Sequence, residues 1–336
     1  MGFVHRITDT ISRGWTLSKL SFSVIRADPE LLLYTFLSAI MVFVTIGAAA
    51  YPGYAAEQSE ESHWAMTDPA VLENGDPQMV MNEETGELEP AGREPTGEYM
   101  AWIFLTYMAG AIIVVFWNSA IIVSAHERLT GGDPTIMTGI KAAFSRIHII
   151  ILWGIIAGTV GLLLRIARDA ANKNSKGGMK FVAMAVLWLV EIAWWVYTFF
   201  IIPMIVLEKK GVREGLRDGR SLFGKTWGEN VTSGLGIGFI SLVGIVFSLV
   251  VAGLIYFTIS PIGGIIIGVA LIGIIVLWAN TAEVVVVAAL YEFAKTGKMP
   301  TLDGNGAKLE EAIPWEPKSG WANESAEIKA WREGTS

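Results

Sequence analysis

The sequence predicts an all-α membrane protein, a polytopic helical bundle, from its composition and from six apolar stretches. Of its 336 residues, 52% are apolar and 17% are charged, and the mean hydropathy is +0.48. Soluble domains carry about 25% charged residues. Each of the six stretches is close to the roughly 20 residues that a helix needs to cross the hydrocarbon core. Because that core holds no water, each stretch has to satisfy its backbone groups within a helix.

The predicted spans divide the chain into three parts. Residues 1–30 form an N-terminal segment, residues 31–292 form the membrane domain, and residues 293–336 form a tail. A long loop, residues 51–99, separates the first two spans. We predict the six spans, which pair into three hairpins, over residues 31–50, 100–124, 147–164, 181–207, 231–257 and 265–290.

The Lys and Arg residues set the expected orientation, because cytoplasmic loops are enriched in them. With both termini inside, 19 of the 25 basic residues face the cytoplasm. The stretch 165–180 is an exception, since it carries five basic residues and would lie outside. Loop 51–99 holds twelve acidic residues and one basic residue, which is typical of a solvated, flexible segment. We predict a multi-pass protein of the cell membrane with both termini cytoplasmic and loop 51–99 outside.

Each odd-numbered span follows a short basic amphipathic segment, which suggests that every hairpin begins with an interfacial helix. Residues 130–135 and 296–301 share the pattern Thr-Gly-x-x-Pro-Thr after the second and sixth spans, which favours an internal repeat. The middle hairpin lacks this pattern. In the first and third segments, the residues that we expect to contact anionic lipid headgroups are Arg6, Arg13, Lys19, Arg26, Arg213, Arg217, Arg220 and Lys225.

Three motifs resemble those of an uncharacterised family of prokaryotic multi-pass membrane proteins of unknown function. They are Asp28-Pro29-Glu30-Leu31-Leu32, the basic segment 220–228, and the set Tyr291, Ala294, Thr296, Gly297 and Pro300. The pattern is also similar to membrane domains that are sometimes joined to glycerophosphodiesterases. The resemblance covers most of residues 1–316, although loop 51–99 is longer than the family pattern implies. It implies a six-helix membrane fold and no established activity or site residue.

Polar residues within the predicted spans are the candidates for a functional site. A carboxylate in the bilayer costs about 2.5 kcal/mol or more, so such residues are expected to face the bundle interior. They follow tryptophans in the three returning spans, and a true repeat would place them at one depth. They would then form either a proton, cation or substrate site or a set of interhelical hydrogen bonds that fix packing. The four residues are Asn118, Glu191, Asn280 and Glu283.

Several classes of function lack support in the sequence. The chain has no cysteine and no nucleotide-binding, metal-binding or nucleophile motif, so we expect no metal and no cofactor. A net charge of −7 disfavours nucleic acid as a partner. We expect a non-catalytic module that organises the membrane or scaffolds a protein partner, with three tryptophans of the tail as docking residues. The alternatives are a small-solute or ion transporter that uses Glu191 and Glu283, and an enzyme that acts on lipid.

Overall fold

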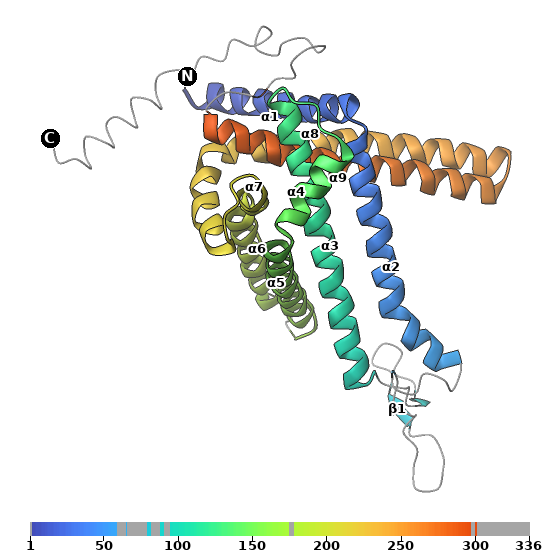
Figure 1. Ribbon diagram of the computed structural model, residues 1–336. Helices are drawn as coiled ribbons and strands as arrows, with labels where there is room; N and C mark the ends of the chain where they lie inside the picture. The colour runs from blue at the N-terminus through green and yellow to red at the C-terminus, as the bar shows by residue number, and fades with distance from the viewer. Residues whose placement is uncertain are drawn as a thin grey trace.

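The computed structural model describes residues 2–58, 65, 79–81, 88–90, 95–174, 178–296 and 300. Within these residues the chain forms nine helices and one short β-hairpin, which confirms the predicted all-α fold (Figure 1). The elements are α1 (Gly2–Ala27), α2 (Glu30–Gln58), β1 (Met79–Met81), β2 (Leu88–Pro90), α3 (Gly97–Leu129), α4 (Ile136–Ser145), α5 (Ile147–Asn174), α6 (Gly178–Thr198), α7 (Ile201–Val206), α8 (Val212–Thr258) and α9 (Pro261–Thr296). The predicted docking residues Trp315, Trp321 and Trp331 lie outside the described residues.

Six helical stretches are long and apolar enough to cross a membrane, as the sequence predicts. Many of their large apolar side chains point away from the protein, such as Phe43, which is 73% exposed, and Phe247, which is 66% exposed. Apolar surface of this extent marks contact with lipid or with another protein. The six stretches are Glu30–Ala55, Gly97–Leu129, Ile147–Lys173, Met179–Val206, Gly236–Thr258 and Pro261–Thr296.

The third span is longer than the sequence predicts. Instead of a span over residues 147–164 and a loop over 165–180, α5 continues to Asn174 and α6 begins at Gly178. The basic residues Arg165 and Arg168 therefore lie on a helix. At about 1.5 Å per residue α5 is about 42 Å long, which exceeds a hydrocarbon core of roughly 30 Å.

The helices run in two directions (Figure 1). α2, α3, α5 and α6 extend from α1 towards the same side of the molecule, whereas α9 and the end of α8 run across them and project beyond α2. α1 also runs across, and it packs against α8 and α9. The third predicted pair does pack as a hairpin, with α8 against α9, and its direction differs from that of the other spans.

The first two pairs of spans are joined by close approaches at glycine. A Cβ atom on Gly154 of α5 would lie 2.7 Å from Cγ1 of Ile112 on α3, and one on Gly158 would lie 2.9 Å from Cε of Met108. At Gly139 of α4, a Cβ atom would lie 2.7 Å from the hydroxyl of Tyr34 on α2. Glycine at these positions lets α4 and α5 pack directly on α3.

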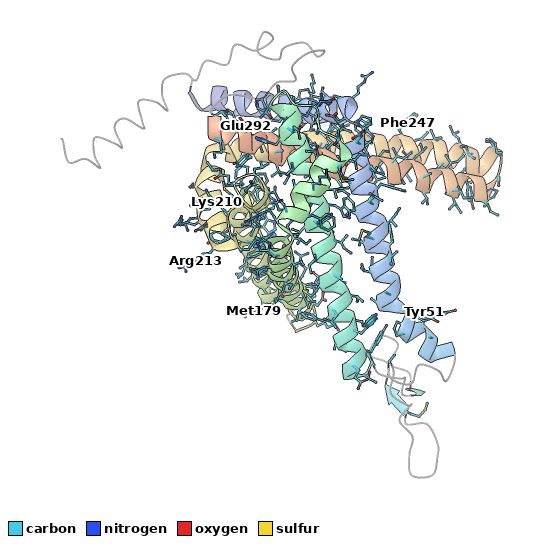
Figure 2. All side chains as sticks on the ribbon, viewed as in Figure 1. Tyr51, Met179, Lys210, Arg213, Phe247 and Glu292 are labelled. Carbon is cyan, nitrogen blue, oxygen red and sulfur yellow. The ribbon has the colours of Figure 1, made fainter. Side chains whose placement is uncertain are left out.

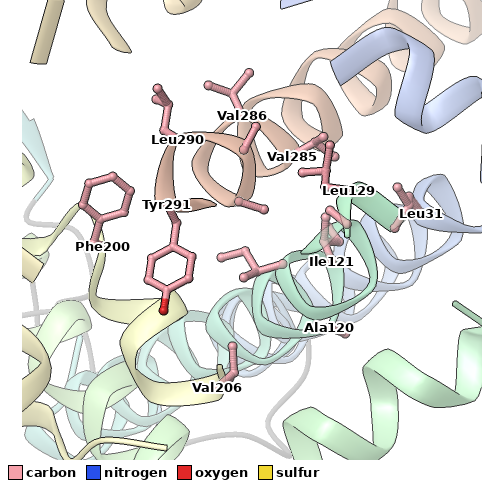
Figure 3. Packing of buried hydrophobic residues seen from close by; sticks show 14 of the residues in the cluster. Leu31, Ala120, Ile121, Leu129, Phe200, Val206, Val285, Val286, Leu290 and Tyr291 are labelled. Atoms are coloured by element: carbon pink, nitrogen blue, oxygen red, sulfur yellow. The ribbon is translucent and has the colours of Figure 1, made fainter. Parts of the chain in front are cut away.

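The buried apolar core draws residues from most of the helices, and one part of it lies where the last turns of α3 and α9 meet α7 (Figure 3). Phe200, Val206 and Leu290 are among its buried residues, and the ring of Tyr291 lies between Phe200 and Val206 with its hydroxyl turned away from Leu290. This core holds together helices that are far apart in the sequence. It also places the polar ends of these helices next to one another.

Within the acidic loop, β1 pairs antiparallel with β2, and Met79 lies opposite Pro90. Ala65 is buried beside Tyr99 at the start of α3. Most of the remaining loop lies outside the described residues.

Candidate functional site

The four polar residues predicted within spans lie on three different helices. Asn118 is half-buried on α3, Glu191 is half-buried on α6, and Asn280 and Glu283 are both exposed on α9. Among the described residues, no hydrogen bond or ion pair joins any two of these four side chains. The proposed convergence at one depth stays a prediction.

Glu191 has a partner that the sequence analysis missed. Its carboxylate forms an ion pair with Arg168 of α5, and the two side chains are 27% and 48% exposed. The sequence predicts a loop at Arg168, because the apolar stretch before it ends at Leu164. The large apolar residue Ile166 continues the helical pattern past that point and was the available signal. The ion pair joins α5 to α6 and favours a packing role for Glu191.

A second set of polar residues, which we call the helix-end cluster, joins the ends of three helices. Two of these helices end at the Thr-Gly-x-x-Pro-Thr segments: α3 ends just before the first segment, and α9 ends on the first threonine of the second. The remaining helix, α7, ends before Glu208-Lys209-Lys210-Gly211, so the middle hairpin contributes charged residues at the same place without the motif. The members of the helix-end cluster are His126, Glu208, Lys210, Asp218, Tyr291, Glu292 and Lys295.

Glu208 is the centre of the helix-end cluster. Its Oε1 accepts hydrogen bonds from the Tyr291 hydroxyl at 2.6 Å and from Lys295 Nζ at 2.5 Å. Its Oε2 lies 2.7 Å from Lys210 Nζ, which is also 3.0 Å from Oδ2 of Asp218. Burial alone would raise the pKa of the Glu208 carboxyl, but the hydrogen bonds from Lys210, Lys295 and Tyr291 lower it to about 2. The ionised carboxylate therefore ties the α7–α8 connection to α9.

The α7–α8 connection is also held by its backbone. Nη2 of Arg146, at the junction of α4 and α5, donates to the carbonyl oxygens of Lys209 at 2.7 Å and Lys210 at 3.0 Å. Lys209 has a φ of 56°, a left-handed conformation that is uncommon outside glycine. These two contacts hold the backbone of the turn that carries Lys210.

His126 connects α3 to this cluster. Its Nδ1 lies 3.5 Å from Oε2 of Glu292, and its ring packs edge-to-face on Tyr291 with the centroids 6.2 Å apart. Figure 2 shows Glu292 near the end of α9, close to α1. The contact brings α3 into the same polar region.

A second ion-pair network lies at the corner between α1 and α2. Arg128 of α3 binds the carboxylates of both Asp28 and Asp133, each of which is followed by a proline. Next to it, the hydroxyl of Tyr34 donates to the carbonyl of Ile136 at 2.8 Å and lies 3.1 Å from Oγ of Ser124. These contacts join α2, α3 and the start of α4. The Asp28-Pro29 motif is thus a structural tie, a role that its sequence alone did not show.

The basic residues of α1 predicted to meet headgroups lie on its outer face where they are described. α1 buries Leu17, Leu20 and Val24 against the rest of the protein, whereas Lys19 and Arg26 are exposed. Nζ of Lys19 also lies 5.6 Å from the ring centroid of the exposed Trp15. The side chains of Arg6 and Arg13 lie outside the described residues.

The start of α8 has the same organisation. Gly215, Gly219 and Phe223 form its buried face, and a Cβ atom on Gly215 would lie 2.7 Å from Cδ1 of Ile201 on α7. The opposite face exposes three arginines: Arg213, Arg217 and Arg220. The side chain of Lys225 lies outside the described residues. Figure 2 shows Arg213 at the edge of the molecule beside Lys210.

Aromatic rings accompany these arginines. The ring of Trp195 on α6 packs edge-to-face on Phe223 at a centroid distance of 5.5 Å and on Phe199 at 5.4 Å, and it is 44% exposed. Trp rings and basic residues are enriched together at membrane–water boundaries. The combination is typical of a helix surface at headgroup level.

No three His, Asp or Glu side chains of the described part come together as a metal site requires. The carboxylate of Glu208 is fully engaged by neighbouring donors, which leaves it poorly suited to act as a base. The arrangement favours binding at the exposed basic faces.

Comparison with known proteins places the chain in a family without assigning it an activity. No curated protein matches the sequence, so this comparison gives no support to the likeness to membrane domains joined to glycerophosphodiesterases. Residues 97–301, more than half of the chain, match the model of a family of unknown function, DUF6159. The match spans α3 to the end of α9 and includes every member of the helix-end cluster. The chain therefore belongs to the DUF6159 family, whose function is unknown.

Proposed function

We propose that this protein organises the membrane by gathering anionic lipids against its basic faces. The observation that carries the proposal is that some basic side chains are paired with carboxylates and others are not. Cations close to the protein interior, such as Arg128 and Lys210, are paired with carboxylates. In contrast, Lys19, Arg26, Arg213 and Arg220 are exposed and form no ion pair with the described residues.

The two basic faces are held rigidly, which favours binding of lipids over simple solvation. α1 and the start of α8 each bury the opposite face against neighbouring helices, so their cations keep a fixed outward direction. An anionic membrane surface attracts each nearby Lys or Arg by about 1 kcal/mol. A protein with several such residues at one level is expected to enrich anionic lipids around itself.

The transporter alternative remains a second prediction. It requires Glu191 and Glu283 to reach a common aqueous path, whereas Glu191 is paired with Arg168 and Glu283 is exposed on another helix. These positions support the packing interpretation of Glu191 over transport. Scaffolding of a protein partner by the tail is likewise a prediction.

Retention of lipid during purification tests the proposal. The protein is extracted from vesicles of equal parts phosphatidylcholine and phosphatidylglycerol, and the bound lipids are quantified by mass spectrometry. We expect a several-fold loss of phosphatidylglycerol from the variant Arg26→Gln/Arg213→Gln/Arg220→Gln. The control variant Arg165→Gln/Lys173→Gln/Lys180→Gln removes the same charge from exposed residues of α5 and α6. An equal loss from both variants, or from neither, contradicts the proposal.

A further inference from the structure

The α8–α9 hairpin, defined here as residues 236–282, is the most apolar part of the chain. Residues 230–282 contain no Asp, Glu, Lys, Arg or His. On α8 the exposed residues Val246, Phe247 and Leu249 point to different sides of the helix, since successive residues are turned by about 100°. A helix at the membrane–water boundary needs one polar face. With apolar surface all round, this hairpin belongs in hydrocarbon.

The hairpin does not run along the other apolar helices. In Figure 1 it crosses the direction of α2 and α3, and Figure 2 shows Phe247 on the part that projects from the body. If α2 and α3 cross the bilayer, a hairpin that runs across them lies along the membrane plane. Its sequence alone would predict two further crossings.

α1 gives the depth of the hairpin. α1 packs on α8 and α9, and the approach at Gly236 leaves no room for a Cβ atom beside Ser18. The outer face of α1 carries Lys19 and Arg26, the residues assigned to headgroups. Packed helix axes lie about 8–10 Å apart. The hairpin therefore lies roughly one helix layer below the headgroups, within the half of a core of about 30 Å that one leaflet fills.

We infer that the α8–α9 hairpin is embedded along one leaflet, where acyl chains cover it, and that it does not cross the bilayer. The inference rests on the proposed function in one respect, the placement of α1 at headgroup level. It adds that the hairpin takes up volume in one leaflet only. Such one-sided insertion would itself organise the surrounding lipid. Both termini stay on one side with four crossing helices as they do with six.

Depth measurements along two matched helix segments test this inference. The chain has no native cysteine, so single spin labels can be placed at Val243→Cys and Val250→Cys on α8 and at Phe36→Cys and Phe43→Cys on α2. All four residues are exposed, and both pairs are seven residues apart. In reconstituted vesicles, collision rates with oxygen and with a water-soluble nickel complex give the depth of each label.

A crossing helix changes depth by about 10 Å over seven residues at 1.5 Å per residue. We expect this change between the α2 labels and nearly equal depths for the α8 labels. A change of about 10 Å on α8 would show that the hairpin crosses the bilayer. Low oxygen collision at both α8 labels would show that a second copy covers the hairpin. Either result overturns the inference, and neither alters the lipid retention that tests the proposed function.

Discussion

The hydroxyl of Tyr291, in the last turns of α9, donates a 2.6 Å hydrogen bond to Oε1 of Glu208, which lies 83 residues earlier in the connection between α7 and α8. Lys295, one turn further along α9, donates to the same oxygen atom. Two donors from α9 thus bind the carboxylate of Glu208, in the segment that leads into α8. This relationship determines how the basic start of α8 is oriented relative to α9.

Replacement of Glu208 should destabilise the protein. Glu208→Gln removes the charge that Lys210 and Lys295 neutralise, and hydrogen bonds to charged groups contribute about 1.5–3 kcal/mol. We expect a lower midpoint of thermal unfolding in detergent at pH 7. The neighbouring exposed variant Glu214→Gln serves as the control and should leave the midpoint unchanged.

The effect of Glu208 should depend on pH. Its folded-state pKa is lowered from 4.5 to about 2. The stabilisation is therefore fully present above about pH 4.5 and is lost as the pH falls towards 2. The difference in unfolding midpoint between the wild type and Glu208→Gln should shrink over this window. A difference that stays constant from pH 6 to pH 3 would show that the charge of Glu208 does not matter.

Asp28 and Asp133 bind the same guanidinium and differ in burial, so they form a matched pair. The side chain of Asp28 is 9% exposed and that of Asp133 is 91% exposed. Breaking a buried pair costs about 3–5 kcal/mol, whereas exposed pairs contribute about 1 kcal/mol or less. Asp28→Asn should therefore lower the unfolding midpoint far more than Asp133→Asn. Equal effects would mean that the Asp28-Pro29 motif does not tie α2 to α3.

Gly139 and Gly47 provide a test of helix approach. A Cβ atom at Gly139 would lie 2.7 Å from Ala120 O, whereas nothing lies within 4 Å of one at Gly47. Gly139→Ala should destabilise by about 1–3 kcal/mol, as overpacking does. Gly47→Ala should be neutral or slightly stabilising because alanine favours a helix. The midpoint of thermal unfolding in detergent is measured for both variants. An unchanged midpoint for Gly139→Ala would contradict the close packing of α4 on α3.

The pair Arg168 and Glu191 should behave as a packing contact. We expect Glu191→Gln and Arg168→Gln each to destabilise, and the double variant to be less destabilised than the sum of the two. A coupling energy of at least 0.5 kcal/mol in this double-mutant cycle would fit residues in contact. Proton-coupled solute flux in vesicles that is lost in Glu191→Gln while stability is unchanged would instead favour the transporter alternative.

The sequence predicts the membrane fold because its signal is local. Twenty apolar residues in a row have to form a helix in lipid, wherever the rest of the chain lies. Apolar composition does not determine the direction of a helix axis relative to its neighbours. The sequence therefore does not predict that α8 and α9 run across α2. It also misplaced the end of α5, because Arg165 looked like the end of a span while the helix continued to Asn174.

The polar contacts were only partly predictable. Glu191 stood out as a carboxylate within an apolar stretch, but its partner Arg168 belongs to a different helix. Glu208 lies in a charged connection and carries no local signal, since its role comes from Tyr291 and Lys295 far along the chain. Packing between distant segments determines such contacts, and a single sequence does not reveal it.

The most direct test of the proposed function measures which lipids surround the protein in an intact bilayer. A donor dye is placed at Ser23→Cys, on the exposed face of α1 between Lys19 and Arg26, or at the exposed Tyr54→Cys, at the far end of α2, as the control. Energy transfer is then compared for acceptor-labelled phosphatidylglycerol and phosphatidylcholine. We predict stronger transfer to phosphatidylglycerol at Ser23→Cys, falling as salt screens the charges, and no such preference at Tyr54→Cys. Equal transfer to both lipids at Ser23→Cys would contradict the claim that this protein gathers anionic lipid.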